Sequence, residues 1–257
     1  MSLAKRIFNK LRKFAVYPQY RRYRAAIGPQ HPLYGITTRL VADARGDPTE
    51  FFDHYAAFAY WTAAKVAARA TPLRILDLGS PKMFNGMLSA THEVTSMVLA
   101  DCRDTISRVR YVRHDVSDPL PFPEGSFDAF TSTVSLPLIG LGRYGDRVNT
   151  QCLPALVREL RRILSADGEL FVSMCLGPNV LNFSNGWFLD LPTIERVLEG
   201  FSIVDCLVDR LSSPRGRTGG AQERFVADTS VAGMPVGDYR VVFLHCRRAA
   251  ARADRAY

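Results

Sequence analysis

Three glycines surround an arginine and an aspartate between residues 140 and 146, where the chain reads Gly-Leu-Gly-Arg-Tyr-Gly-Asp. Glycines at this density let the backbone approach a ligand closely. Arg143 could bind a carboxylate or phosphate on a substrate, and Asp146 could act as a general base. Alternatively, Arg143 and Asp146 pair with each other and only hold the loop. The apolar flanks and Tyr144, which we expect to be buried, favour a binding site over an ordinary surface loop.

Strands and helices alternate along the body of the chain. Residues 54–70 are alanine-rich with apolar residues at helical spacing, and an apolar run at residues 73–79 predicts a buried strand that ends in Asp77 and Gly79. Six more strands are predicted at residues 94–100, 110–114, 127–134, 169–174, 202–208 and 239–246, and two more helices at 153–164 and 193–199. No internal repeat is present, and the Gly-rich tract at 212–220 is expected to lie in a long loop.

This alternation predicts an α/β protein with a Rossmann-like, doubly wound, mostly parallel sheet of about seven strands and helices on both faces. Ligands of such sheets bind outside the carboxyl ends of the strands. The Gly140–Asp146 segment follows the fourth predicted strand, and Asp77 lies at the end of the first. Both are therefore expected near a ligand site.

The formal net charge of +8 resides in the first 24 residues. The first 24 residues contain eight basic residues and no acidic one, and the first acidic residue of the chain is Asp43. The eight are Lys5, Arg6, Lys10, Arg12, Lys13, Arg21, Arg22 and Arg24. Beyond Arg24, 25 basic residues are balanced by 25 acidic residues. Apolar residues recur among them every three or four positions, at Leu3, Ile7, Phe8, Leu11, Phe14 and Ala15. We therefore expect a basic amphipathic arm over residues 1–45, followed by the α/β domain over 46–257.

The arm suits an anionic membrane surface, bound through residues 1–28, because each basic residue near such a surface contributes about 1 kcal/mol. Nucleic acid is the competing partner, since Tyr17, Tyr20 and Tyr23 could stack on bases. It is disfavoured by the neutral body and the lack of a nucleic-acid-binding motif. A solvated helix, or one docked on the core, is the third alternative. Charge interrupts every apolar run, so neither a secretory signal nor a membrane span is expected.

The five cysteines are odd in number, widely spaced and without a C-x-x-C pair. This pattern predicts neither a disulfide framework nor a zinc site, and a reducing cytoplasm fits it best. His114 has no second His or Cys near it in the sequence, so no metal site is expected.

Acidic residues recur at the predicted strand ends. Asp77 closes the first strand, Asp101 follows the second and Asp115 the third. In a nucleotide-binding fold, an acidic residue after the second strand can accept bonds from both ribose hydroxyls. From about residue 55 to 248, the chain resembles the class I S-adenosylmethionine-dependent methyltransferases. The resemblance rests on five segments in the same order, at residues 76–80, 115–116, 126–129, 156–164 and 166–170.

The resemblance implies that S-adenosylmethionine is the cofactor. It places seven residues at the cofactor: Asp77, Gly79, Ser80, Asp101, Arg103, Asp115 and Val116. A closer resemblance is to a methyltransferase-like family of uncharacterised function marked by the sequence GLGRYGD, with Asp101–Arg103 upstream and residues 180–183 downstream. Members of that family are often associated with bacterial surface-polysaccharide genes. The resemblance to this family implies O-methylation of a sugar at the cytoplasmic membrane, with glycan-assembly enzymes as partners.

Two departures from these families bear on catalysis. Pro81 and Met83 make the turn after the first strand bulkier than a G-x-G turn, and Pro137 and Leu138 stand where the closer family has Glu and His. A sugar hydroxyl must lose a proton, and a positioned base contributes roughly 10²–10⁴-fold. The remaining candidates for that base are Asp146, our first choice, His114 and Tyr144. Arg143, Asn182 and Trp187 are expected to bind the acceptor, the last two from a loop at residues 179–187.

Two further functions stay open at this stage. One is a catalytically inactive methyltransferase-like protein that binds partners of a glycan-assembly complex. The other is a nucleic-acid methyltransferase, which is disfavoured because residues 131–134, Thr-Ser-Thr-Val, replace an N-P-P-Y-like tetrapeptide after the fourth strand. Binding of S-adenosylmethionine would separate an enzyme from an inactive scaffold.

Overall fold

The computed structural model describes residues 53–102, 104–142, 144–182, 186–210 and 224–249, together with Tyr17, Pro18, Arg21 and Ala25, which are helical. The rest of the predicted arm and the tract at 212–220 lie outside the described residues. The division of the chain at residue 45 therefore stays a prediction.

The body contains ten strands. They are β1 (Arg74–Leu78), β2 (Glu93–Val98), β3 (Val109–Arg113), β4 (Phe127–Thr133), β5 (Leu164–Leu176), β6 (Val180–Asn182), β7 (Gly186–Leu189), β8 (Phe201–Asp209), β9 (Phe225–Val226) and β10 (Arg240–Arg248). The helices are α2 (His54–Ala67), α3 (Lys82–Leu88), α4 (Cys152–Ile163) and α5 (Leu191–Val197), with a short 3-10 helix, η2, at Leu136–Leu138.

The main path of the sheet runs β3-β2-β1-β4-β5-β10-β8-β9. Strands β1 to β5 pair in parallel, and β10 lies antiparallel between β5 and β8. This confirms the predicted doubly wound, mostly parallel sheet. All seven predicted strands are present, and the count rises to ten through β6, β7 and β9. The order of the chain reverses between β1 and β4, and such a reversal opens a crevice at the carboxyl ends of the two strands.

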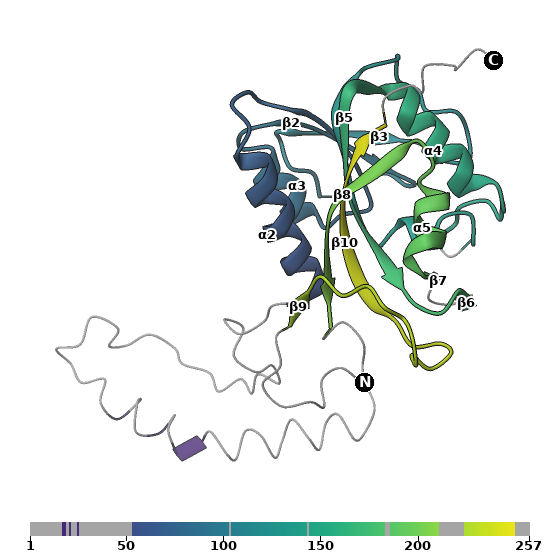
Figure 1. Cartoon of the computed structure of the whole chain (residues 1–257). Helices are drawn as coiled ribbons and strands as arrows, with labels where there is room; N and C mark the ends of the chain where they lie inside the picture. Colours follow the sequence, from purple (N-terminus) through teal and green to yellow (C-terminus); the bar gives the residue numbers. More distant parts are fainter. Residues whose placement is uncertain are drawn as a thin grey trace, which may run out of the picture. The chain divides into compact units, whose positions relative to one another are not determined.

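Helices cover both faces of the sheet, with α2 and α3 on one face and α4 and α5 on the other (Figure 1). Two separate clusters of buried residues fill the two interfaces. One contains Phe58 of α2 and Phe84 of α3, and the other contains Leu156 and Leu160 of α4 and Ile194 of α5. The predicted pair of helix-on-sheet layers is confirmed.

Local sequence explains where the main helices begin and which face they bury. Asp53 caps α2 by accepting a 2.9 Å bond from the Ala56 N–H, and Asp190 caps α5 by accepting one from Thr193. Four apolar residues of α4 recur at three- and four-residue spacing and are all buried: Leu153, Leu156, Val157 and Leu160. The short helix α3 was not predicted; Pro81 precedes it and provides no side-chain cap.

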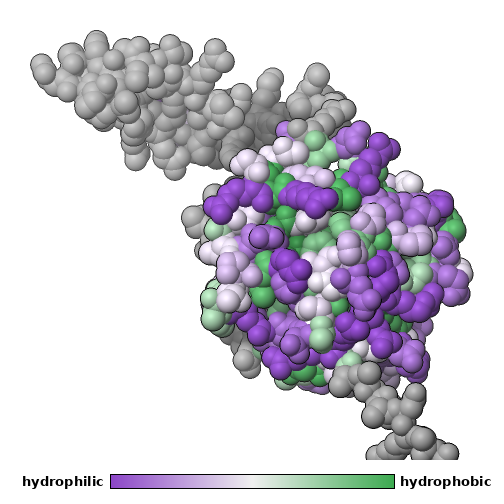
Figure 2. Space-filling model, turned by 90° about the horizontal axis from the view of Figure 1, so that it is seen from above, coloured by the Kyte–Doolittle hydropathy of each residue, from purple (hydrophilic) through white to green (hydrophobic). Residues whose placement is uncertain are grey.

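Seen from above, the surface of the body is covered mainly by hydrophilic side chains, with hydrophobic residues scattered between them (Figure 2). Among the residues that the structure describes, no helix is both long and apolar enough to cross a membrane.

Candidate functional site

A cavity of about 410 Å³ opens where the carboxyl ends of β1, β2, β3 and β4 meet. Each of these strands contributes to the wall, through Leu78 and Gly79, Met97 to Leu99, His114 and Val116, and Thr133 to Ser135. Tyr55 of α2 and the segment after η2 complete it, the latter through Leu138, Ile139, Tyr144 and Asp146. Its size lies within the range of small-molecule pockets, roughly 300–1,000 Å³.

The turn after β1 requires glycine at residue 79. Its φ angle is +75°, and a Cβ atom there would lie 2.1 Å from the Ser135 Oγ atom. Residues other than glycine rarely adopt this backbone conformation. The turn after β1 and the turn after β4 are therefore in direct contact at the cavity wall, and both Gly79 and Ser135 line the cavity.

Asp77 is fully buried rather than exposed on the cavity wall. Its carboxylate accepts hydrogen bonds from Asn85 Nδ2 at 2.8 Å, Thr131 Oγ1 at 2.9 Å and Ser96 Oγ at 3.3 Å. Burial raises the pKa of Asp77, while the hydrogen bonds that it accepts oppose that change. Ser80, which follows Gly79 in the turn after β1, donates its backbone N–H to Asp77 Oδ2 at 3.4 Å. The buried Asp77 carboxylate thus holds this turn in place.

A row of hydroxyl groups at the end of β4 joins it to β1. Ser132 donates to the Leu78 carbonyl at 2.9 Å, Thr133 to the Ser80 hydroxyl at 3.0 Å, and Ser135 to the Gly79 carbonyl at 3.3 Å. These are the residues that stand in place of an N-P-P-Y-like tetrapeptide or follow it directly. They line or brace the cavity, a role that the sequence did not indicate.

Val134, between these hydroxyl residues, has a φ angle of +50°. A β-branched residue in the left-handed region is a backbone outlier that costs on the order of 1–3 kcal/mol and is typical of functional sites. The buried Ser173 hydroxyl on β5 accepts a 2.9 Å bond from the Val134 N–H and holds it there.

The end of β2 does not have the predicted arrangement. Met97, Val98 and Leu99 present an apolar wall to the cavity, whereas Asp101 is absent from that wall. Its carboxylate lies 3.5 Å from Arg113, and its side chain is 86% exposed. The structure therefore does not bring Asp101 together with the other predicted cofactor residues. Arg103 lies outside the described residues.

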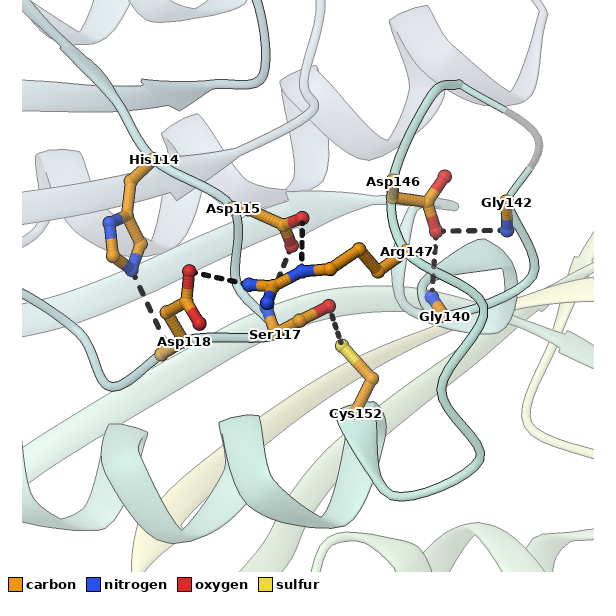
Figure 3. A network of polar contacts seen from close by, with 9 residues as sticks. All are labelled: His114, Asp115, Ser117, Asp118, Gly140, Gly142, Asp146, Arg147 and Cys152. Carbon is orange, nitrogen blue, oxygen red and sulfur yellow. Dashed lines mark hydrogen bonds and ion pairs between the residues drawn. The ribbon is translucent and has the colours of Figure 1, made fainter.

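The end of β3 brings His114, Asp115 and Val116 to the cavity, with His114 and Val116 on its wall. The Asp115 carboxylate accepts a 2.9 Å bond from the Ser117 N–H (Figure 3). His114 Nε2 lies 3.3 Å from the Asp118 carbonyl oxygen. Because a carbonyl only accepts, this contact assigns the proton to Nε2 and leaves Nδ1 as the atom that can accept one.

The Gly140–Asp146 loop is organised by Asp146. One carboxylate oxygen accepts bonds from the backbone N–H groups of Gly140 at 2.9 Å and Gly142 at 3.1 Å (Figure 3). The other oxygen accepts one from the Tyr144 backbone N–H at 3.1 Å. Asp146 reaches the cavity wall as predicted, but its carboxylate holds the loop closed. The prediction that it pairs with Arg143 falls on a residue that the structure does not describe.

Tyr144 corrects one prediction. We expected a buried side chain, but it is 64% exposed at the cavity rim. Burial is instead provided by Leu136 and Pro137 at its base, both within η2.

Pro137 and Leu138 stand where the GLGRYGD family, which the sequence resembles, has Glu and His, and both lie in the short helix η2. Pro137 is buried in η2, and Leu138 contributes only apolar surface to the cavity. The structure offers no replacement carboxylate or imidazole at these two positions. A base, if needed, must come from another part of the wall.

The predicted loop at residues 179–187 is in fact largely a hairpin, because β6 and β7 pair antiparallel with Leu181 opposite Trp187. Its Gly186 packs on η2, where a Cβ atom would lie 2.7 Å from the Pro137 carbonyl oxygen. Asn182 lies opposite Gly186, and the Trp187 side chain is 37% exposed. Neither residue lines the cavity, but their hairpin contacts the segment that carries Leu138.

Arg147 is the functional candidate that the sequence analysis missed. Its guanidinium contacts Asp115 at 3.3 Å and Asp118 at 2.5 Å, so it connects the loop to the end of β3 (Figure 3). The signal in the sequence is a basic residue directly after Asp146. Within the described residues, no group of three His, Cys, Asp or Glu side chains could hold a metal ion.

Solved structures of other proteins share this architecture. The Burkholderia thailandensis 1,6-didemethyltoxoflavin-N1-methyltransferase, with bound 1,6-didemethyltoxoflavin and S-adenosylhomocysteine, matches with a TM-score of 0.53 and 16% identity, over 76% of this chain and 78% of that one. The body has the class I methyltransferase fold.

Two more structures widen the comparison. The [4+2]-cyclase SpnF has a TM-score of 0.53 and 17% identity, with 76% of this chain and 82% of that chain covered. The Bacillus subtilis YcgJ protein has a TM-score of 0.50 and 15% identity, with 76% of this chain and 100% of that chain covered. No protein-family model and no curated protein sequence matches the chain. Since these proteins differ in their reactions, a class I methyltransferase fold does not by itself fix the chemistry.

Proposed function

We propose that this protein is an S-adenosylmethionine-dependent methyltransferase whose cofactor occupies the cavity at the ends of β1 to β4. The observation that carries the proposal is the contact between Gly79 and Ser135 on the cavity wall. Only a residue without a Cβ atom fits there, so the turns after β1 and β4 pack closely on the cavity wall at the point where the strand order reverses, which is where ligands of such sheets bind.

The composition of the site fits this cofactor. Met97, Leu99 and Val116 provide apolar surface for a purine ring. The buried Asp77 carboxylate accepts four hydrogen bonds and so holds the turn after β1 that carries Gly79, a residue of the cavity wall. When bound, the cofactor supplies a methyl group on a sulfonium, and because this leaving group is good, alignment of donor and acceptor provides much of the acceleration.

We further propose that the acceptor is a sugar hydroxyl in a surface-polysaccharide precursor. The resemblance to the GLGRYGD family motivates this proposal, and the hairpin beside Leu138 supports it. Trp187 on that hairpin offers a partly exposed aromatic face, to which a sugar ring can bind, and Asn182 offers an amide.

Three side chains on the wall could take the hydroxyl proton. The Asp146 carboxylate already accepts three backbone N–H groups, and Tyr144 would first have to ionise. His114 has no such demand on Nδ1, which is the ring nitrogen left to accept a proton when Nε2 donates to the Asp118 carbonyl. We therefore place His114 ahead of Asp146, which was our first choice from the sequence.

Transfer of a labelled methyl group tests this proposal. Full-length protein is incubated with S-adenosylmethionine labelled on the methyl carbon and with lipid-linked sugars extracted from bacterial membranes. Label recovered in methylated sugar after acid hydrolysis is expected, and its loss in a His114→Gln variant would assign the base. Label in no sugar, with intact cofactor binding, would contradict the sugar acceptor while leaving the cofactor assignment in place.

The basic N-terminal arm bears on where in the cell the protein acts. We propose that residues 1–28 bind the anionic inner face of the cytoplasmic membrane, next to lipid-linked acceptors and glycan-assembly enzymes. Residues 1–28 contain eight basic residues and no acidic one, and apolar residues recur among them at helical spacing.

A further inference from the structure

The exposed apolar side chains of the body gather at the edge of the sheet where the cavity opens. Eleven large apolar or aromatic side chains are exposed among the described residues from 53 to 249. Three of them line the cavity: Tyr55, Leu99 and Tyr144. Five more lie around it without lining it: Met83, Val148, Leu181, Trp187 and Val236. The other three, Tyr60, Met87 and Val204, lie farther from the strand ends, on α2, α3 and β8.

Two of the five surrounding side chains lie on segments that form the cavity. Met83 is the second residue of α3, which follows the turn after β1, and it is 66% exposed. Val148 lies against the Gly140–Asp146 loop, because a Cβ atom on Gly142 would be 2.9 Å from its Cγ2 atom. It is nevertheless 73% exposed, so it faces solvent beside the cavity mouth.

The other three follow β5 or precede β10. Leu181 and Trp187 are opposite each other on β6 and β7, and their hairpin packs on η2. Val236, which is 80% exposed, lies in the turn that Asp238 closes with a bond to the Pro235 carbonyl, directly before β10. These side chains lie outside the cavity wall, so a ligand held in the cavity does not account for their exposure.

The charged residues next to Val148 are paired within the protein. Asp146 accepts three backbone N–H groups, and Arg147 forms ion pairs with Asp115 and Asp118. The loop therefore presents Tyr144 and Val148 at its surface, with the neighbouring charges already satisfied.

The opposite edge of the sheet has a different surface. The arrow of β5 points down in Figure 1, so the view from above in Figure 2 looks onto the amino ends of the parallel strands, which are covered mainly by hydrophilic side chains. The exposed apolar surface is thus one-sided. A concentration of this kind marks a surface that binds a partner or a membrane.

The sequence indicates which of these it is. Residues 1–28, with eight basic residues and no acidic one, precede α2 in the chain, and α2 begins at the cavity with Tyr55 as its second residue. Tyrosine and tryptophan have an apolar ring and a polar tip, which suit the boundary between lipid and water. An anionic membrane satisfies both the basic segment and the apolar edge.

We propose that the carboxyl edge of the sheet rests on the anionic membrane surface, so that the cavity opens toward the lipid. This inference rests on the proposed membrane binding of residues 1–28: the basic arm supplies the attraction, and the apolar edge sets the orientation of the body. A lipid-linked acceptor would then reach the cavity without leaving the membrane. Trp187, our candidate for the sugar, would lie at the level of the lipid headgroups, where such a sugar also lies.

The two tryptophans of the chain provide a direct test, because Trp187 lies at this edge and Trp61 packs on Phe58 and Phe243 beneath α2. Full-length protein is bound to phosphatidylglycerol vesicles whose acyl chains carry bromine near the headgroup, and sedimentation measures the bound fraction. Bromine quenches only tryptophans that come close to it. In Trp61→Phe, Trp187 should lose fluorescence on brominated but not on unbrominated vesicles. In Trp187→Phe, Trp61 should keep its fluorescence on both. The unchanged protein should show the quenching that Trp187→Phe lacks, which makes the result independent of how well Trp61→Phe folds.

A pair of valines tests the apolar edge itself. Val148→Ser combined with Val236→Ser should weaken vesicle binding by about fivefold, because two exposed apolar side chains no longer enter the interface. Val204→Ser makes the same change at an exposed position on β8 and should leave binding unaltered.

Three results would overturn the inference while leaving the membrane binding of the arm in place. Bound protein could show no quenching of Trp187, or equal quenching of both tryptophans, or the double valine variant could bind as the unchanged protein does. Self-association of the unchanged protein that the double variant weakens would instead assign this edge to a second copy of the chain. If the full-length protein does not sediment with the vesicles, the proposed location fails, and the inference fails with it.

Discussion

Gly79 and Ser135 are in contact across the crevice between β1 and β4, so that a single added methyl group on Gly79 would lie 2.1 Å from the Ser135 Oγ atom. The two residues belong to turns that are more than fifty positions apart in the sequence. Their contact sets the width of the cavity at the point where the chain order of the sheet reverses.

Gly79→Ala should therefore abolish cofactor binding and lower the free energy of unfolding by about 2–3 kcal/mol, from backbone strain at positive φ and overpacking against Ser135. Denaturant unfolding and calorimetry measure the two effects. Adding Ser135→Gly removes the clashing side chain and should restore part of the stability. Gly125→Ala, at a positive-φ glycine with open space around it, isolates the strain. Equal effects of both alanine variants would contradict the contact as the cause.

Asp146→Asn should loosen the Gly140–Asp146 loop, because the carboxylate accepts three backbone N–H groups and an amide oxygen replaces it poorly. Hydrogen exchange at the amides of Gly140, Gly142 and Tyr144 should accelerate by about tenfold, which corresponds to about 1.4 kcal/mol of lost protection. Asp167→Asn, at an exposed position, serves as the control. Unchanged exchange would show that the loop is held by other contacts and would return Asp146 to the role of a free base.

A buried cluster around Glu169 should govern stability in acid. Glu169 on β5 binds Arg69 and lies 3.0 Å from His245 Nε2 and 3.2 Å from Arg247 Nε. Burial opposes ionisation, but these partners prevail and lower the pKa of Glu169 from 4.5 to about 2. A lowered folded-state pKa gives stability that is present above about pH 4.5 and is lost as the pH falls toward 2.

Glu169→Gln should accordingly cost about 2–3 kcal/mol at pH 7, and its unfolding free energy should vary less between pH 5 and pH 2 than that of the unchanged protein. Chemical unfolding across that pH range measures both. Glu195→Gln on the exposed side of α5 should leave the pH dependence as it is. Parallel pH curves for Glu169→Gln and the unchanged protein would contradict this assignment.

The sheet could be predicted from sequence because its central strands are buried on both faces. Continuous apolar runs such as Ile75–Leu76 and regular spacing in α4 report burial directly, and every predicted strand is found. The strands that were missed, β6, β7 and β9, are two to four residues long. Pairing of such short strands depends on neighbours distant in the sequence, so local pattern does not reveal it.

The sequence places part of the site correctly because residues directly after parallel strands gather at one edge of the sheet. Gly79 and Val116, which were expected from the resemblance to class I methyltransferases, line the cavity, as do His114 and Asp146. The exposure of Asp101 and Tyr144 and the bridge from Arg147 to Asp115 depend on how loops fold over the strand ends. Charged residues on a loop have several possible partners, and only the three-dimensional path of the loop selects one.

Deleting residues 1–28 should abolish binding to vesicles that contain anionic lipid at low salt, because it removes all eight of the basic residues in excess. Sedimentation with phosphatidylglycerol vesicles measures this, and neutral phosphatidylcholine vesicles are the control. Equal sedimentation of the shortened and full-length chains would remove the membrane proposal. Retention of RNA by the full chain would favour nucleic acid as the partner of the arm.

The central claim is that the cavity at the ends of β1 to β4 binds S-adenosylmethionine, and calorimetric titration of the full-length protein with this cofactor tests it most directly. We expect a dissociation constant in the micromolar range, lost in Leu99→Trp, which fills the partly exposed rim of the cavity, and kept in Val204→Trp, at an exposed position on β8. No heat of binding at millimolar cofactor, or equal binding by Leu99→Trp, would contradict it.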